Sequence, residues 1–223
     1  MKLREIAIFT AYQHQYQSIF NPQTWCIQEQ YWRYLGAYDT GPFAKITIRV
    51  NDDPVMKYKD FALDNTCLTV VGIDKYLDVA NFLGSSSTKK KTALVNLLHD
   101  GMLFLCDHYL WDKEPLVRAY ELCLENNLEY KFKLRDKTYR SPQRNWYGAI
   151  YCDWDLHYFK ATARIEDING ELIKEQELLN IEPYFGEFIY YAKSKWDDAY
   201  TFSLYSKTGE KWSIRLMTLV VNE

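Results

Sequence analysis

The segment TKKKTALVNLLHDGMLFLCDHYLWDKEPLVRAYELCLENN, residues 88–127, decides the predicted fold. Apolar side chains recur in it at steps of three and four residues, which gathers them on one face of a helix. One such stripe runs from Leu94 to Tyr109, and a second begins at Leu116. The segment therefore predicts two consecutive helices, and we find no other long helical signal in the chain.

The ends of these helices carry residues typical of helix termini. Asp112 is placed as an N-cap with Pro115 in the following first turn, and Asn127 suits a C-terminal stop. Gly101 lies inside the first helix, where glycine costs roughly 1 kcal/mol relative to alanine. A glycine there predicts that another element crosses the helix closely.

Outside the helical pair, the apolar period changes from about 3.6 residues to two. Residues 43–50 and 128–134 alternate apolar with polar side chains, which predicts half-buried antiparallel strands. Residues 167–170 (DING) and 206–209 (SKTG) predict type I turns with a left-handed glycine, each closing a bulged hairpin.

These two turns also predict registers. The second turn puts the apolar pairs of its hairpin on one face, with the pairs Leu204–Trp212, Phe202–Ile214 and Ser203–Ser213. The first turn would place Ala161 and Ala163 opposite glutamates. We therefore expect the strand after residue 170 to fray, to bulge or to lie at a sheet edge.

Four further segments carry weaker local signals. Residues 12–28 are rich in glutamine and interrupted by Pro22, which predicts a loop. Residues 28–39 favour a strand over a short helix, residues 74–83 a short helix, and residues 187–192 another strand.

The predicted fold class is α+β, a largely antiparallel, aromatic-rich sheet packed against the helical pair of about residues 88–127. Runs of strands kept apart from the helices favour this class over a doubly wound fold. The 223 residues are expected to form a single domain. Within it, residues 1–72 supply N-terminal strands, residues 73–127 the helical block and residues 128–223 an antiparallel meander.

Composition limits the functional classes. Hydrophobic residues make up 48% of the chain, which argues against disorder, and a net charge of −3 gives no general reason to expect nucleic acid. The 19 tyrosines and 7 tryptophans suit both sheet cores and recognition surfaces.

Cysteine usage and hydropathy predict a cytoplasmic location. The five cysteines are odd in number and form no CxxC motif, which favours reduced thiols. No stretch approaches the roughly 18 apolar residues of a membrane span, and the apolar run after Glu5 is too short for a signal peptide.

One candidate site is the start of the first helix. Helix N-termini attract anions, and this one carries hydroxyl groups and lysines at Ser86, Ser87, Thr88, Lys89, Lys90 and Lys91. The spacing is not that of a P-loop. The alternative is a serine linker with an N-cap and a solvated lysine turn.

A second candidate lies before the last hairpin, at Trp196, Asp197, Asp198 and Tyr200. Aromatic residues beside acids on a loop are typical of protein-recognition sites. The alternative is a tryptophan that folds back to cover the end of the sheet.

Residues 131–144 hold six basic residues and one acid, and residues 166–182 hold six acids and one base. Basic residues at period two could follow single-stranded nucleic acid. The neighbouring aromatic side chains fall on the opposite face, however, so we expect basic and acidic strands to neutralise each other across the sheet.

No motif identifies a reaction. His99 and Cys106 share a helical face, but neither further metal ligands nor an orienting acid can be recognised near them, and a packing role is the alternative. We therefore predict no catalytic residue, no metal and no cofactor, while an enzymatic function stays open.

Residues 89–103 (KKKTALVNLLHDGML) and 202–213 (FSLYSKTGEKWS), in this order around a second helix and an aromatic meander, resemble the cytosolic immunity proteins of bacterial polymorphic toxin systems. The resemblance implies a non-enzymatic domain that binds and blocks one partner toxin. The alternative is an enzyme or binding protein for an anionic small molecule, a phosphate or nucleotide, at the serine- and lysine-rich helix start.

Overall fold

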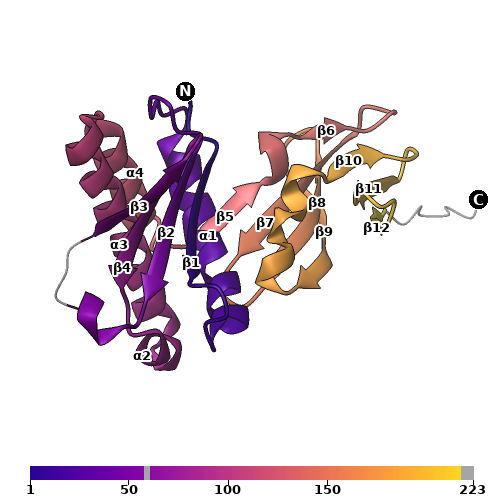
Figure 1. Ribbon diagram of the computed structural model, residues 1–223. Coiled ribbons are helices and arrows are strands. Elements are labelled where there is room, and N and C mark those ends of the chain that lie inside the picture. Colours follow the sequence, from indigo (N-terminus) through magenta and orange to yellow (C-terminus); the bar gives the residue numbers. More distant parts are fainter. Residues whose placement is uncertain (58–60, 217–223) are drawn as a thin grey trace, which may run out of the picture. The chain divides into compact units, whose positions relative to one another are not determined.

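Helices and mostly antiparallel sheets make up the chain, which confirms the predicted α+β class. The computed structural model describes residues 1–57 and 61–216 (Figure 1). The chain divides into two compact units, Met1–Glu129 and Tyr130–Glu223. Their boundary lies close to the predicted passage from the helical block to the meander.

The first unit contains a four-stranded mixed sheet in the order β1-β2-β4-β3. Its strands are β1 (Glu5–Thr10), β2 (Lys45–Asn51), β3 (Ala62–Cys67) and β4 (Val70–Tyr76). The middle strand β2 pairs in parallel with both β1 and β4, and β3 pairs with β4 antiparallel. The prediction for residues 43–50 was therefore right about alternation and wrong about direction, since a helix returns the chain between β1 and β2.

One face of this sheet is apolar and the other is polar. In register, Ile8 lies beside Ile48, which lies beside Ile73, and all three are buried. On the opposite face, the guanidinium of Arg49 pairs with the carboxylate of Asp74 at 2.6 Å. The alternation thus sorts side chains between a helix-covered core and a solvent-facing surface.

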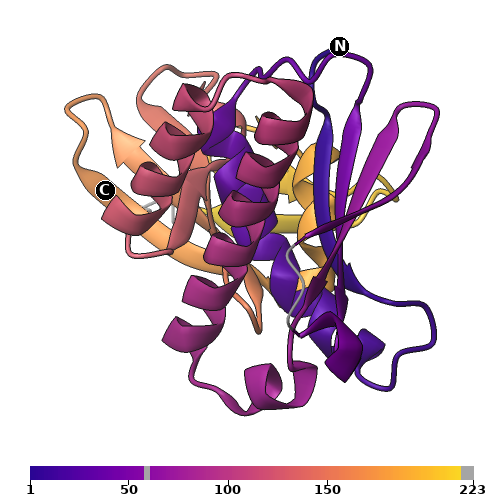
Figure 2. The same cartoon turned by 60° about the vertical axis from the view of Figure 1, so that its left-hand side comes forward.

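Helices supply the other layer of the first unit. They are α1 (Gln17–Leu35), α2 (Val79–Gly84), α3 (Ser87–Tyr109) and α4 (Glu114–Glu125), with a short 3-10 helix η1 (Pro54–Met56) after β2. The predicted pair is confirmed as α3 and α4, which run side by side in Figure 2.

Helix α1 was not predicted, because its glutamines and Pro22 gave the appearance of a loop. Its buried side chains nevertheless recur at helical spacing: Phe20, Thr24, Ile27, Tyr31 and Leu35. Thr24 and Tyr31 bring hydroxyl groups to this face, and Thr24 Oγ1 donates a hydrogen bond to the carbonyl of Ile8 at 3.0 Å. A helix face that mixes polar with apolar residues gives only a weak apolar period.

Helix α3 crosses the mixed sheet at Gly101. A Cβ atom built there would lie 2.8 Å from Cδ1 of Ile73 and 2.9 Å from Cδ1 of Ile48. The expected close crossing is therefore confirmed. The covered sheet, however, is the mixed sheet of the first unit, not the antiparallel meander on which we had placed the helical pair.

The second unit holds two antiparallel sheets. The larger one consists of β5 (Tyr130–Lys133), β6 (Tyr139–Arg140), β7 (Trp146–Trp154), β8 (Phe159–Asp167) and β9 (Leu172–Ile181), and the smaller one of β10 (Lys193–Trp196), β11 (Thr201–Tyr205) and β12 (Lys211–Arg215). Two 3-10 segments, η2 (Leu134–Asp136) and η3 (Pro183–Tyr190), connect strands. These antiparallel sheets confirm the predicted meander.

The two sheets of this unit pack face to face. A Cβ atom at Gly148 of β7 would lie 2.7 Å from the ring of Phe202 of β11, so the sheets approach closely at this point. Large aromatic side chains fill the space between them, and Trp154, Phe159 and Phe202 are fully buried.

Both predicted hairpins form, but only the second has the predicted register. In the first hairpin, Ala161 lies opposite Leu179 and Ala163 opposite Gln176, so neither faces a glutamate as predicted. The β11–β12 register is the predicted one, with Leu204 opposite Trp212, Phe202 opposite Ile214 and Ser203 opposite Ser213. Gly170 and Gly209 both have positive φ, as the turns require. Strand β9 lies at the sheet edge and shifts register twice against β8, as its poorly matched side chains predicted.

Besides the loop predicted for residues 12–28 and the strand favoured for residues 28–39, both of which α1 replaces over much of their length, two further local predictions were wrong. The predicted helix of residues 74–83 is divided, because β4 extends to Tyr76 and α2 begins only at Val79. The predicted strand of residues 187–192 is largely the 3-10 segment η3. At Gly186 of η3, a Cβ atom would lie 2.2 Å from the ring of Trp154, so the backbone packs directly on this side chain.

Candidate functional site

The predicted partner-binding residues lie together where β10 turns into β11. Trp196, at the end of β10, donates a hydrogen bond from Nε1 to the carbonyl of Tyr139 at 2.8 Å. Its ring lies 5.3 Å from that of Phe202. These contacts favour the alternative role for Trp196, that of covering the end of the sheet.

Asp197 is the centre of a polar cluster on the outer face of the three-stranded sheet. Its carboxylate accepts hydrogen bonds from Ser203 Oγ at 2.5 Å and from the hydroxyl of Tyr205, and it pairs with Nζ of Lys211 at 2.8 Å. Burial alone would raise the pKa of Asp197, but these hydrogen bonds, that from Lys211 foremost, lower it to about 2. The carboxylate is therefore ionised and held by its own sheet.

Asp198 shapes the same connection. Its Oδ1 accepts hydrogen bonds from the backbone amides of Tyr200 at 2.7 Å and Thr201 at 2.8 Å. The hydrogen bond from the amide of Tyr200, followed by the hydrogen bonds from Thr201, lowers the pKa of Asp198. The structure thus brings Trp196, Asp197, Asp198 and Tyr200 together, and it uses both carboxylates in internal contacts.

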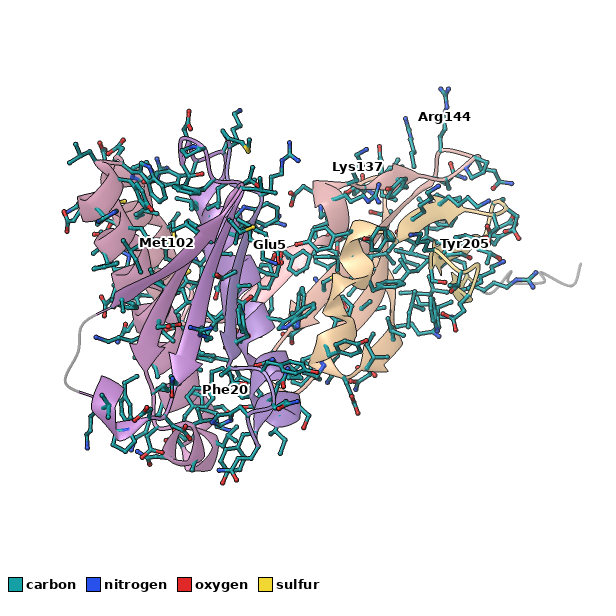
Figure 3. All side chains as sticks on the ribbon, in the orientation of Figure 1. Glu5, Phe20, Met102, Lys137, Arg144 and Tyr205 are labelled. Carbon is teal, nitrogen blue, oxygen red and sulfur yellow. The ribbon has the colours of Figure 1, made fainter. Side chains whose placement is uncertain are left out.

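Beside this connection lies a hollow of about 470 Å³, here called the β10 hollow. Its lining consists of Arg135, Tyr139, Lys193, Ser194, Lys195 and Tyr205; Tyr205 is labelled in Figure 3. These residues come from η2, β6, β10 and β11, so only the folded second unit gathers them. The sequence analysis missed this site, although the period-two lysines of the KSKW segment were a signal for it.

A second depression, here called the β7 groove, runs over the outer face of the five-stranded sheet and has a volume of about 550 Å³. Its lining consists of Lys131, Phe132, Lys133, Tyr151, Cys152, Asp153, Thr162, Arg164 and Glu175. Tyr151 lies near its centre, with the guanidinium of Arg164 4.5 Å and the ammonium of Lys133 5.5 Å from the ring centroid. Cations over an aromatic ring form a preorganised, partly apolar surface.

Charges of both signs meet on this face. Arg164 of β8 pairs with Glu175 of β9, and Lys160 lies 3.8 Å from Glu177. These two acids therefore pair with bases of β8, and not with the basic segment 131–144 as predicted. The basic residues from 131 to 144 lie on β5, η2, β6 and the loop that follows, on the other side of β7.

The predicted anion site at the start of α3 is structured differently from our expectation. Ser86 is the N-cap and accepts a hydrogen bond from the amide of Lys89 at 3.4 Å, while α3 itself begins with Ser87, Thr88 and Lys89. Lys90 and Lys91 are buried, and Nζ of Lys90 donates to Oε1 of Gln23 at 3.1 Å. Burial lowers the pKa of Lys90. The ammonium groups therefore do not converge on one exposed site.

His99 and Cys106 have separate tyrosine partners in the core. Nδ1 of His99 lies 3.1 Å from the hydroxyl of Tyr31, and its ring stacks on Tyr120 at 4.3 Å. Sγ of Cys106 lies 3.2 Å from the hydroxyl of Tyr38. Burial lowers the pKa of His99 and raises that of Cys106, which keeps the imidazole neutral and the thiol protonated.

An imidazole–carboxylate pair joins the loops that follow β1 and β2. Nε2 of His14 lies 3.0 Å from Oδ2 of Asp52, and Nδ1 accepts a hydrogen bond from the amide of Tyr16. Because Nδ1 is an acceptor, Nε2 carries the hydrogen and donates it to Asp52. The sequence analysis did not single out this pair, since its members are 38 positions apart.

Within residues 1–57 and 61–216, no group of three or more histidine, cysteine, aspartate or glutamate side chains is placed to hold a metal ion. No helix of this described part is long and apolar enough to cross a membrane. Comparison with protein-family models, with curated proteins and with solved structures found no match.

Proposed function

We propose that this chain is a non-enzymatic protein-binding domain, an inhibitor of immunity type that blocks one partner toxin in the bacterial cytoplasm. The observation that carries the proposal is the β7 groove. It is an open sheet face on which tyrosine, arginine, lysine and carboxylate side chains lie within one depression.

This mixture fits a protein partner. Tyrosine and arginine are enriched where protein interfaces concentrate their binding energy, and Tyr151 and Arg164 stack here at 4.5 Å. Charges of both signs complement the mixed charges of another protein. A nucleic acid would instead meet the carboxylates of Asp153 and Glu175 inside the groove.

The buried reactive side chains support a non-enzymatic role. The thiol of Cys106 and the imidazole of His99 both hydrogen-bond to buried tyrosines. Groups used in this way contribute to packing and have no access to a substrate. The alternative, phosphate or nucleotide binding at the start of α3, has weaker support because Lys90 and Lys91 are buried there.

The proposal is tested by quantitative affinity purification from the native host with four variants. Tyr151→Ala and Arg164→Ala remove the centre of the β7 groove. Tyr12→Ala and Arg118→Ala remove the same residue types from exposed positions of the first unit. We expect one stoichiometric partner with the wild type and both controls, and about tenfold less of it with each groove variant.

A wild-type chain that retains no stoichiometric partner would overturn the protein-binding proposal, as would equal losses in the groove and control variants. The immunity role has its own test. A toxin encoded beside this gene should arrest growth when expressed alone, and co-expression of this chain should restore growth. Failure of this rescue would remove the immunity role and leave the binding result intact.

A further inference from the structure

We propose that the β10 hollow binds a phosphate monoester carried on a planar organic group, such as an aryl phosphate or a nucleoside monophosphate. This site is independent of the β7 groove and of the start of α3. It combines three cations and two tyrosine side chains.

The lining is positively charged without a carboxylate of its own. Within the described part of the chain, Lys193 has no ion-pair partner, and Lys195 lies 4.0 Å from Asp197. Asp197 is already paired with Lys211 at the shorter distance of 2.8 Å. The hollow therefore keeps cationic charge that an anion would neutralise.

Arginine and lysine together suit a phosphate. The guanidinium of Arg135 donates one hydrogen bond to the carbonyl of Tyr190 at 3.3 Å, which orients it and leaves further donors for a ligand.

Ser194 also lines the hollow. It lies opposite the buried Leu204 and is only 7% exposed, so its side chain is on the face of β10 opposite to the side chains of Lys193 and Lys195. The cations of Arg135, Lys193 and Lys195, and not this hydroxyl group, would therefore hold the phosphate.

The walls are held in place before any ligand enters. The ring of Tyr139 lies 5.9 Å from that of Phe202, and its backbone carbonyl accepts the hydrogen bond from Trp196. The hydroxyl of Tyr205 is bound to Asp197. The ammonium of Lys195 lies over the ring of Tyr205 at 5.0 Å, so the ring of Tyr139 is the stacking surface for a planar group. A volume of about 470 Å³ suits a small organic ligand.

The experiment is calorimetric titration at low salt with phenyl phosphate, AMP and a phosphotyrosine peptide. Phenol, adenosine and the unphosphorylated peptide are the uncharged counterparts. We expect each phosphate to bind at least about tenfold more tightly than its counterpart. Tighter binding of AMP identifies a free nucleotide as the source of the phosphate, and tighter binding of the peptide identifies a phosphorylated protein; either ranking supports the site.

Two variants and a control locate the binding. Lys193→Gln and Lys195→Gln should each weaken binding about tenfold, because each removes a charged donor from the hollow. Lys207→Gln removes an equal charge from an exposed position of the same unit outside the lining and should change affinity less than about twofold. Thermal unfolding verifies that each variant is folded.

The proposal is overturned if the phosphates bind no more tightly than their uncharged counterparts. Equal losses in Lys193→Gln and Lys207→Gln would also overturn it, since they would indicate general attraction to a basic surface. Neither result depends on whether the β7 groove binds a protein.

Discussion

A single carboxylate, that of Asp197, holds together the outer face of the three-stranded sheet. It is bound by side chains from β11 and β12, namely Ser203, Tyr205 and Lys211. Acid beside tryptophan predicted a recognition loop here, and the structure gives the carboxylate an internal role. Only the pairing of β10, β11 and β12 brings these partners to it.

We predict that Asp197→Asn lowers the free energy of unfolding by about 1–3 kcal/mol, because Lys211 and Tyr205 lose their charged acceptor. Urea denaturation at neutral pH measures this change. The control is Glu210→Gln, an exposed acid of the same unit, for which the expected change is below about 0.5 kcal/mol.

The effect of Asp197 should also depend on pH. Its pKa is lowered from 3.8 to about 2 in the folded protein, so its contribution to stability is complete above pH 3.8. The contribution is lost as the pH falls towards 2. Denaturation of the wild type and Asp197→Asn across this range should therefore show their stabilities converging, and a constant difference would contradict the assignment.

His99 should shape the pH profile at less acidic values, just below pH 6.5. Burial lowers its pKa below 6.5, so the unfolded state binds a proton that the folded state does not. Stability should therefore fall below pH 6.5, by at most about 1.4 kcal/mol per pH unit. Urea midpoints at several pH values should lose part of this slope in His99→Gln and keep it in His108→Gln, the control at an exposed helix end.

At the scale of elements, close crossings decide which glycines are essential. Gly101→Ala would place a methyl group against Ile48 and Ile73, and we expect a net loss of about 1–2 kcal/mol despite the better helix propensity of alanine. Gly84→Ala is the matched control, since Gly84 is also helical and has no atom within 4 Å of its Cβ position. Thermal denaturation should show Gly84→Ala neutral or stabilised; equal losses would contradict the crossing.

Helix α1 shows where element prediction from sequence fails. Its buried face includes Gln23, Thr24 and Gln28, whose side chains are satisfied by neighbours far along the chain. A polar residue that gains a buried partner is indistinguishable in sequence from one that faces water. The β11–β12 hairpin, in contrast, depends on a local turn and on alternation, and its register was predicted residue by residue.

At the scale of the whole molecule, each unit has a core of its own. Met1–Glu129 buries the apolar face of its mixed sheet under its helices, and Tyr130–Glu223 buries aromatic side chains between two sheets. We therefore predict that residues 1–129 fold when expressed alone. Circular dichroism and a cooperative thermal transition would verify this, and a disordered fragment would favour the single domain expected from the sequence.

The sequence by itself determined the α+β class, the α3–α4 pair, the alternation of β2 and β5, and the β11–β12 register. All of these follow from side-chain period and turn chemistry over a few neighbouring residues. The tertiary structure alone decided the parallel pairing of β2, the existence of α1, the internal role of Asp197 and the assembly of the β10 hollow. Each of these depends on partners distant in sequence, and local periodicity carries no information about which distant residue will become the neighbour.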